Sequence, residues 1–227
     1  VHQQLTTGDC NLALGTFANA GNTTGHNNIA IGDKSGAMNT GASGSCNVMI
    51  AVGTGNSLTT GSDNIFVGRD AGYEVKSSSR NVIIGCGAGR CLRDGGGSNT
   101  FIGDQAGHYM GRCDCSTNTG NTFIGQGAGK SIVNSCHAIA IGYQAAHGIA
   151  NCKLFASHTI NIGCRAGCKM EGGNSIINIG RMAGASNSGG SFNVNIGYQA
   201  GYNNLTGGNN FYGGYLAGFC NKTGGSN

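Results

Sequence analysis

The sequence contains no proline and no tryptophan, and charged residues make up only 10% of its 227 positions. The lack of proline excludes a collagen triple helix, even though glycine accounts for 45 residues. The scarcity of charge, together with regularly spaced Ile, Val and Phe, argues against intrinsic disorder. No apolar run approaches the roughly 20 residues of a membrane-spanning helix, so we expect no membrane span. The chain begins at Val1 without a charged and then apolar leader, as a mature or excised segment would.

The sequence also lacks the patterns that indicate catalysis, metal binding or nucleic-acid binding. The nine acidic residues and six histidines fall at scattered positions, which pairs no carboxylates for acid–base chemistry. Cys136 and His137 are adjacent and would point to opposite faces of a strand, against a nucleophile–base pair. There is no Cys-x-x-Cys zinc spacing, residues 125–131 (GQGAGKS) lack the first glycine of a phosphate-binding loop, and basic residues form no stripe. We therefore expect no enzyme activity, cofactor, metal or nucleic-acid partner.

What the sequence does have is one phrase that recurs along its whole length. It reads Asn, any residue, two mostly apolar residues, Gly, two variable residues, Ala, Gly, and its clearest copies cover residues 64–72, 81–89, 99–107, 121–129 and 193–201. The central glycines are Gly15, Gly32, Gly53, Gly68, Gly85, Gly103, Gly125, Gly142, Gly163, Gly180, Gly197 and Gly214. Their commonest spacing is 17 residues, with no unrelated segment between copies. We therefore predict a single repeat domain over residues 1–227.

The period of the repeat predicts an all-β fold. Seventeen residues are too few for a helical hairpin or a propeller blade, which need about 30–50, but suit one coil of a β-solenoid. We expect a parallel β-solenoid, a β-roll or β-helix, of about twelve coils of ~17 residues, stacked about 4.8 Å apart into a rod on the order of 55 Å long. An Asn starts eight units and would stack its amide on the Asn of the next coil. Nine central glycines, from Gly68 to Gly214, are followed three residues later by an Ala that would fill an inner corner.

The alternation of residues within each expected strand predicts which side chains face the core. The residue before the central Gly and the residue two positions earlier are mostly Ile, Val or Leu. Residues two apart share one face of a strand, so we expect both columns to point inward. The residue between them would then point outward. This outward column, a candidate for lateral packing, contains Phe66, Phe101, Phe123, Asn161, Asn178 and Asn195.

The recurring phrase resembles two related sets of repeats. Ala30-Ile31-Gly32 and Ala140-Ile141-Gly142 are similar to the Ala-Ile-Gly core in the head domain of YadA-like trimeric autotransporter adhesins. Residues 99–107 and 121–129 match the Asn-Thr-Phe-Ile-Gly-x-x-Ala-Gly repeat of bacterial and phage fibre-like surface proteins. The resemblance covers nearly the whole chain. It implies a parallel solenoid and a place outside the cell or on its surface.

Eleven cysteines predict that disulfides staple the coils together. Neighbouring coils lie within the Cα separation that a disulfide tolerates, and the offsets from the central glycines pair Cys91 with Cys113, Cys115 with Cys136, and Cys152 with Cys168. The alternative is a set of free thiols in a reducing compartment. Cys10 and Cys220 lie at opposite ends of the expected rod and are candidates for linking subunits stacked head to tail.

Three sequons, at Asn22, Asn204 and Asn221, are candidate glycosylation sites in a secretory pathway that attaches N-glycans. Their chance occurrence in a chain rich in Asn and Thr is the alternative.

Together these observations favour a non-catalytic structural subunit of an extracellular fibre or filament, built by stacking solenoid units, whose partner is another copy of itself. The alternative is a trimeric adhesin or fibre head that recognises a receptor or glycan. An ice-binding solenoid is a third possibility. It would need a regular array of Thr, whereas Thr100 and Thr122 are the only strand threonines in their column, which we expect to point inward.

Overall fold

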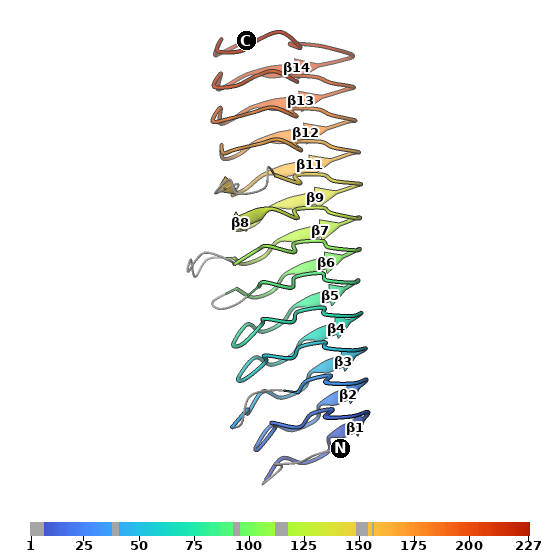
Figure 1. Ribbon diagram of the computed structural model, residues 1–227. Coiled ribbons are helices and arrows are strands. Elements are labelled where there is room, and N and C mark those ends of the chain that lie inside the picture. The colour runs from blue at the N-terminus through green and yellow to red at the C-terminus, as the bar shows by residue number, and fades with distance from the viewer. Residues whose placement is uncertain (1–6, 38–40, 93–95, 112–117, 149–153, 156) are drawn as a thin grey trace.

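The computed structural model describes residues 7–37, 41–92, 96–111, 118–148, 154–155 and 157–227. Over these residues the chain winds into a parallel β-solenoid, and its two ends lie at opposite ends of a rod (Figure 1). The predicted all-β solenoid is confirmed. The described part of the chain holds no helix long and apolar enough to cross a membrane.

Fourteen short strands are seen in the described residues. Twelve form one parallel sheet along a single face of the rod, in the order β1-β2-β3-β4-β5-β6-β7-β9-β11-β12-β13-β14. They are β1 (Leu12–Leu14), β2 (Ile29–Ile31), β3 (Val48–Ile50), β4 (Ile65–Val67), β5 (Val82–Ile84), β6 (Thr100–Ile102), β7 (Thr122–Ile124), β9 (Ile139–Ile141), β11 (Ile160–Ile162), β12 (Ile177–Ile179), β13 (Val194–Ile196) and β14 (Phe211–Gly213). The other two, β8 (Ile132–Asn134) and β10 (Leu154–Phe155), pair with each other.

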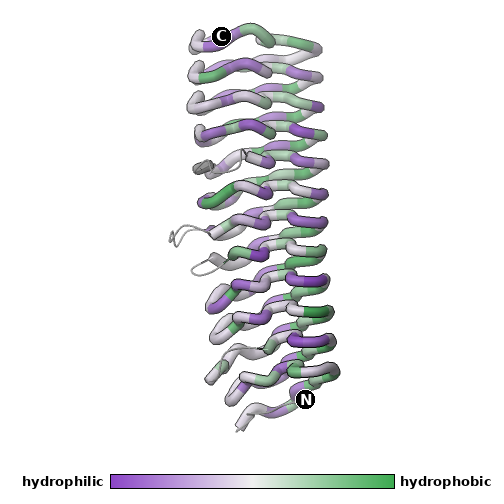
Figure 2. Tube along the Cα trace, viewed as in Figure 1, coloured by the Kyte–Doolittle hydropathy of each residue, from purple (hydrophilic) through white to green (hydrophobic). Residues whose placement is uncertain are grey.

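Strict register stacks equivalent residues of successive coils on one another. Phe101 of β6 lies opposite Phe123 of β7, for example, and their rings stack with centroids 5.1 Å apart. Hydrophobic segments consequently recur coil after coil along the rod (Figure 2).

The predicted direction of the strand side chains is wrong. The middle residue of the strands faces the core: Phe66, Phe101, Phe123, Asn178 and Asn195 are fully buried, and Asn161 is 1% exposed. The flanking aliphatic residues face outward instead. The column before the central Gly includes Leu14, which is 65% exposed, and Ile102, which is 36% exposed.

The reason for this reversal is the narrow interior of the coil. Each inner corner is closed by a small residue, and the predicted corner alanines from Ala71 to Ala200 are fully buried. All of these alanines except Ala145 are followed by a Gly that lies close to the interior: a Cβ placed on Gly72 would approach the Phe66 ring to 3.0 Å. The interior therefore takes one strand side chain per coil, from the size of Ala30 to that of Phe66, which leaves no room for two isoleucines.

The predicted asparagine ladder is confirmed, and it runs beside the start of each strand. Asn64 shows the pattern: its Nδ2 donates to Oδ1 of Asn47 at 3.0 Å and to the carbonyl of Ser78 at 3.0 Å. Its Oδ1 accepts from the backbone N–H and from Nδ2 of Asn81, at 3.0 and 2.9 Å. Each buried amide thus joins three coils and satisfies its own hydrogen-bonding groups.

The asparagine ladder is interrupted in three coils, where Ala138, Thr159 and Ile176 occupy its position. A second, internal ladder begins close by. Asn178 donates to Oδ1 of Asn161 and Asn195 donates to Oδ1 of Asn178, both at 2.7 Å. In these coils the side-chain hydrogen bonds between coils are therefore made by the middle residue of the strand instead of by the residue that precedes the strand.

One central position of the repeat is corrected by the structure. Ile31 pairs with Ile50 of β3, so Ala51 rather than Gly53 follows that strand as the equivalent of Gly32. Ala51 adopts a φ of 119°, close to the values of the central glycines. Val52, expected in an inward column, is half exposed and lies beyond the strand.

The corner glycines give a direct test of this packing. Replacing Gly129 by alanine is expected to destabilise the protein by about 2–4 kcal/mol, because its φ is +60° and the new Cβ would lie 2.5 Å from the Phe123 ring. Gly189→Ala is the control, since nothing lies within 4 Å of that Cβ. Denaturant midpoints measure both. Equal midpoints for the two variants would contradict the packing.

Candidate functional site

The outer face of the twelve-stranded sheet is a surface that runs along the described part of the rod. It consists of the first and third residues of each strand, hereafter the outer sheet face. Of these 24 positions, two in each of twelve strands, all are aliphatic or Phe except Thr100, Thr122 and Gly213. None is charged. Thr100 and Thr122, expected inside, are thus on the surface, but two threonines in twelve strands do not make the array that ice binding needs.

The outer sheet face is large for an apolar surface. Twelve strands about 4.8 Å apart, with two columns about 6.6 Å apart, give a stripe roughly 50 Å long and 10 Å wide. Its footprint of about 500 Å² matches the largest apolar patch of a typical monomer, which is commonly functional. Side chains along its whole length are exposed, from Leu12 at 53% through Ile65 at 42% to Phe211 at 63%.

The three sequons do not offer free side chains. Asn22 and Asn204 are fully buried, and the Nδ2 atom that would carry a glycan donates to the carbonyls of Gly25 and Gly207, both at 2.9 Å. Asn221 is half-buried and makes the same contact with Gly224 at 3.3 Å. The glycosylation prediction is therefore wrong for Asn22 and Asn204 in the folded coil, because an inward amide closes each of these turns.

The predicted disulfides are not shown. Each candidate pair includes Cys113, Cys115 or Cys152, which lie outside the described residues. Of the other partners, Cys136 and Cys168 are thiols. Cys91 directs its Sγ at Glu74 Oε1, 3.9 Å away. The further thiols of the described residues are Cys10, Cys46, Cys86, Cys164 and Cys220. Cys10 and Cys220 are both exposed and belong to coils near opposite ends of the rod. Whether they link subunits stays a prediction.

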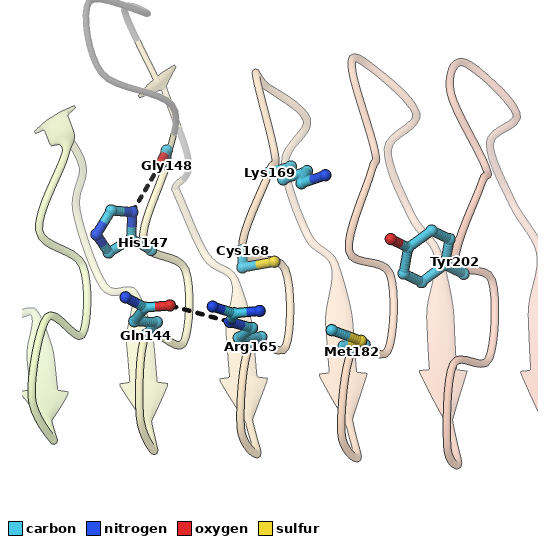
Figure 3. Close-up of a pocket in the computed structure, with 8 residues that line it drawn as sticks. All are labelled: Gln144, His147, Gly148, Arg165, Cys168, Lys169, Met182 and Tyr202. Carbon is cyan, nitrogen blue, oxygen red and sulfur yellow. Dashed lines mark hydrogen bonds between the residues drawn. The ribbon is translucent and has the colours of Figure 1, made fainter.

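A groove of about 330 Å³ crosses four neighbouring coils (Figure 3). Arg165 donates to Gln144 Oε1 at 3.0 Å along its floor, and Cys168, Lys169 and Tyr202 also line it. Burial raises the pKa of the Cys168 thiol, against the opposing effect of Arg165 and Lys169. A thiol with a raised pKa is less ionised, and therefore less nucleophilic, near neutral pH.

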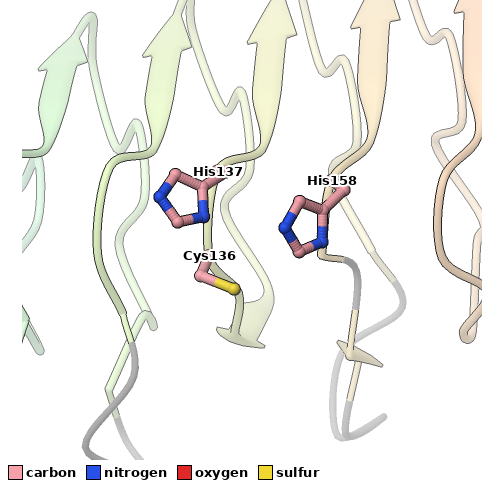
Figure 4. Close-up of side chains that lie close together, drawn as sticks. All are labelled: Cys136, His137 and His158. Atoms are coloured by element: carbon pink, nitrogen blue, oxygen red, sulfur yellow. The ribbon is translucent and has the colours of Figure 1, made fainter.

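A second cluster joins two neighbouring coils at the turn before β9 and β11. Cys136, His137 and His158 place their ligand atoms within 4.8 Å of one another (Figure 4). The two imidazole rings stack with centroids 5.4 Å apart. His137 and His158 are exposed and Cys136 is half-buried, with its Sγ 3.4 Å from the hydroxyl of Ser157.

The expectation that Cys136 and His137 point apart is wrong. It assumed an extended strand, whereas His137 adopts a left-handed turn conformation with φ of 54°. The sequence did hold a signal for this cluster. His137 and His158 are 21 residues apart, the same separation as Gly142 and Gly163, so both lie five residues before a central glycine.

Comparisons of the chain with protein families, with curated proteins and with solved structures found no match. The fold and the surfaces described above are therefore the basis for a functional conclusion.

Proposed function

We propose that this chain is a non-catalytic structural subunit that assembles with further copies of itself through the outer sheet face, as part of a fibre outside the cell or on its surface. The observation that carries the proposal is the uncharged aliphatic stripe along all twelve strands. Its two columns repeat at the same spacing in every copy, so the face is complementary to itself when two rods lie side by side. The extracellular setting is supported by the resemblance of the repeat to fibre-like surface proteins.

The size and chemistry of the stripe favour a second copy over other occupants. Its footprint of about 500 Å² approaches the ~800 Å² that each partner buries in a standard interface. The absence of charge from its 24 positions disfavours a nucleic acid or an acidic glycan as its partner. Burying this face removes aliphatic side chains from water, which is the main driving force for association.

Introducing lysine into the stripe tests the proposal. The double variant Ile84→Lys and Ile102→Lys is expected to remain folded, because both side chains are at least 36% exposed, and to shift the protein from assemblies to monomers. Two charges on adjacent strands would have to be desolvated in the interface. Sedimentation velocity and electron microscopy of the unreduced protein measure the change.

The control adds the same two charges elsewhere, at the exposed turn residues Thr60 and Thr206. Thr60→Lys with Thr206→Lys should leave assembly intact. A monomeric unmodified protein, or assemblies that survive lysines in the stripe, would overturn the proposal. Discrete trimers instead of fibres would indicate the adhesin-like head, in which the same face is buried at the centre.

A further inference from the structure

We propose that Cys136, His137 and His158 form a binding site for a divalent metal ion of zinc-like chemistry, which clamps two neighbouring coils together. The three residues supply one thiolate and two imidazoles, the ligands that zinc prefers in proteins. They come from two coils that are adjacent in the sheet, since β9 pairs directly with β11. A bound ion would therefore cross-link the stack.

The backbone holds these ligands in place before any metal arrives. His158 donates its backbone N–H to the carbonyl of Cys136 at 3.0 Å, which fixes the separation of the two coils at this turn. His137 and His158 share the same left-handed backbone conformation, with φ of 54° and 56°. Both rings consequently project in one direction, with the Cys136 sulfur beside them (Figure 4).

The distances are close to those of a tetrahedral zinc site. Zinc lies about 2.0–2.1 Å from nitrogen and about 2.3 Å from sulfur, which places its ligand atoms roughly 3.3–3.7 Å apart. The three ligand atoms here lie within 4.8 Å of one another. Side-chain rotations that bring them about 1 Å closer suffice, and both histidines are exposed to solvent. Water completes the coordination.

The two histidines are exposed, and the positions that stack on them are uncharged. The equivalent positions in the neighbouring coils are Gly120 and Ser175, neither of which carries a charge. Gly120 lies beside the His137 ring, where an added Cβ would come within 3.0 Å of Cδ2. No lysine or arginine occupies this column within one coil of the cluster.

The position of the cluster in the rod gives it a structural purpose. It lies immediately before Ala138 and Thr159, two of the three positions where the asparagine ladder is interrupted. The asparagine ladder therefore supplies no bond between these two coils, although the backbone N–H of Ala138 still donates to Oδ1 of Asn121 in the coil before it, at 3.0 Å. A metal ion held by both coils would replace that link at the point where it is missing.

Metal titration of the reduced full-length chain tests the inference. Cobalt(II) is the probe, because thiolate coordination gives it an intense charge-transfer absorption and a tetrahedral site gives it strong visible bands. We expect one equivalent of cobalt to bind with both signals and to be displaced by zinc. Zinc should also raise the Tm of the unmodified protein, since a ligand that binds only the folded state stabilises it.

Two variants and two matched controls decide the outcome. Cys136→Ser and His158→Gln should each lose the cobalt signal, one equivalent of zinc in equilibrium dialysis and the rise in Tm. Cys46→Ser and His26→Gln remove an exposed thiol and an exposed imidazole elsewhere and should retain all three. If Cys136→Ser and His158→Gln bind as much cobalt and zinc as the controls, the site does not exist.

Discussion

Replacing Phe101 by alanine is expected to lower the free energy of unfolding by about 3–5 kcal/mol, the usual cost of removing a fully buried aromatic side chain. Phe101 has no exposed surface and stacks on Phe123 of the next coil. The alanine would leave a cavity in a stack whose neighbours are fixed by the register of the sheet. Chemical denaturation of the monomeric protein measures the loss.

The control for this prediction is the next residue of the same strand. Ile102 faces outward and is 36% exposed, so Ile102→Ala should cost only about 1 kcal/mol. The pair therefore reports the direction of the two side chains. If Ile102→Ala were the more damaging of the two, the strand would be oriented as the sequence alone suggested, with isoleucine in the core.

Replacing Asn64 by alanine is expected to cost about 2–4 kcal/mol, although the side chain is small, since each buried polar group left unpaired costs roughly 1–3 kcal/mol. The alanine would remove the hydrogen-bond acceptor of the backbone N–H and the Nδ2 of Asn81, and the donor to the carbonyl of Ser78. Thermal and denaturant unfolding measure the effect. Asn56→Ala, at a half-exposed asparagine of another turn, should change stability by less than about 0.5 kcal/mol.

A conservative change at the same position separates hydrogen bonding from shape. Asn64→Asp keeps the volume but loses both Nδ2 donors and turns an oxygen toward Oδ1 of Asn47. It should therefore destabilise the protein at least as much as alanine at neutral pH. A neutral result for aspartate would mean that the ladder contributes packing rather than hydrogen bonds.

The solenoid itself was predictable because a repeat copies each physical requirement many times. The corner alanines, the left-handed glycines and the ladder asparagines each meet a requirement that recurs in every coil, so the sequence repeats them with the period of the coil. Ala128 and Asn64 are where they were expected, and both are fully buried.

The face of the strand that is buried was not predictable from hydropathy, because the outer face is aliphatic in nearly every strand and the inner face includes Asn161, Asn178 and Asn195. Alternation shows only that Ile65 and Val67 share a face that Phe66 does not. The assignment of the more aliphatic face to the core failed because that face is the outer sheet face. The small volume enclosed by the coil decides which face is buried, and the close approach of Gly72 to the Phe66 ring shows how small that volume is.

The cluster of Cys136, His137 and His158 was only partly predictable from the sequence. His137 and His158 are as far apart as the central glycines that follow them, and this equal separation, which can be read from the sequence, indicates that they share one column. That Cys136 joins them required the left-handed turn at His137, which rotates its side chain to the side of its neighbour.

The sequence by itself thus determined the parallel solenoid, its modal period and the asparagine ladder, because each depends on contacts between identical positions of successive coils. Only the tertiary structure decided which strand face is buried, that the amides of Asn22 and Asn204 close turns from the inside, and that a thiol and two imidazoles meet across two coils. These features depend on the space inside the coil and on the path of the chain through its turns, which no single position encodes.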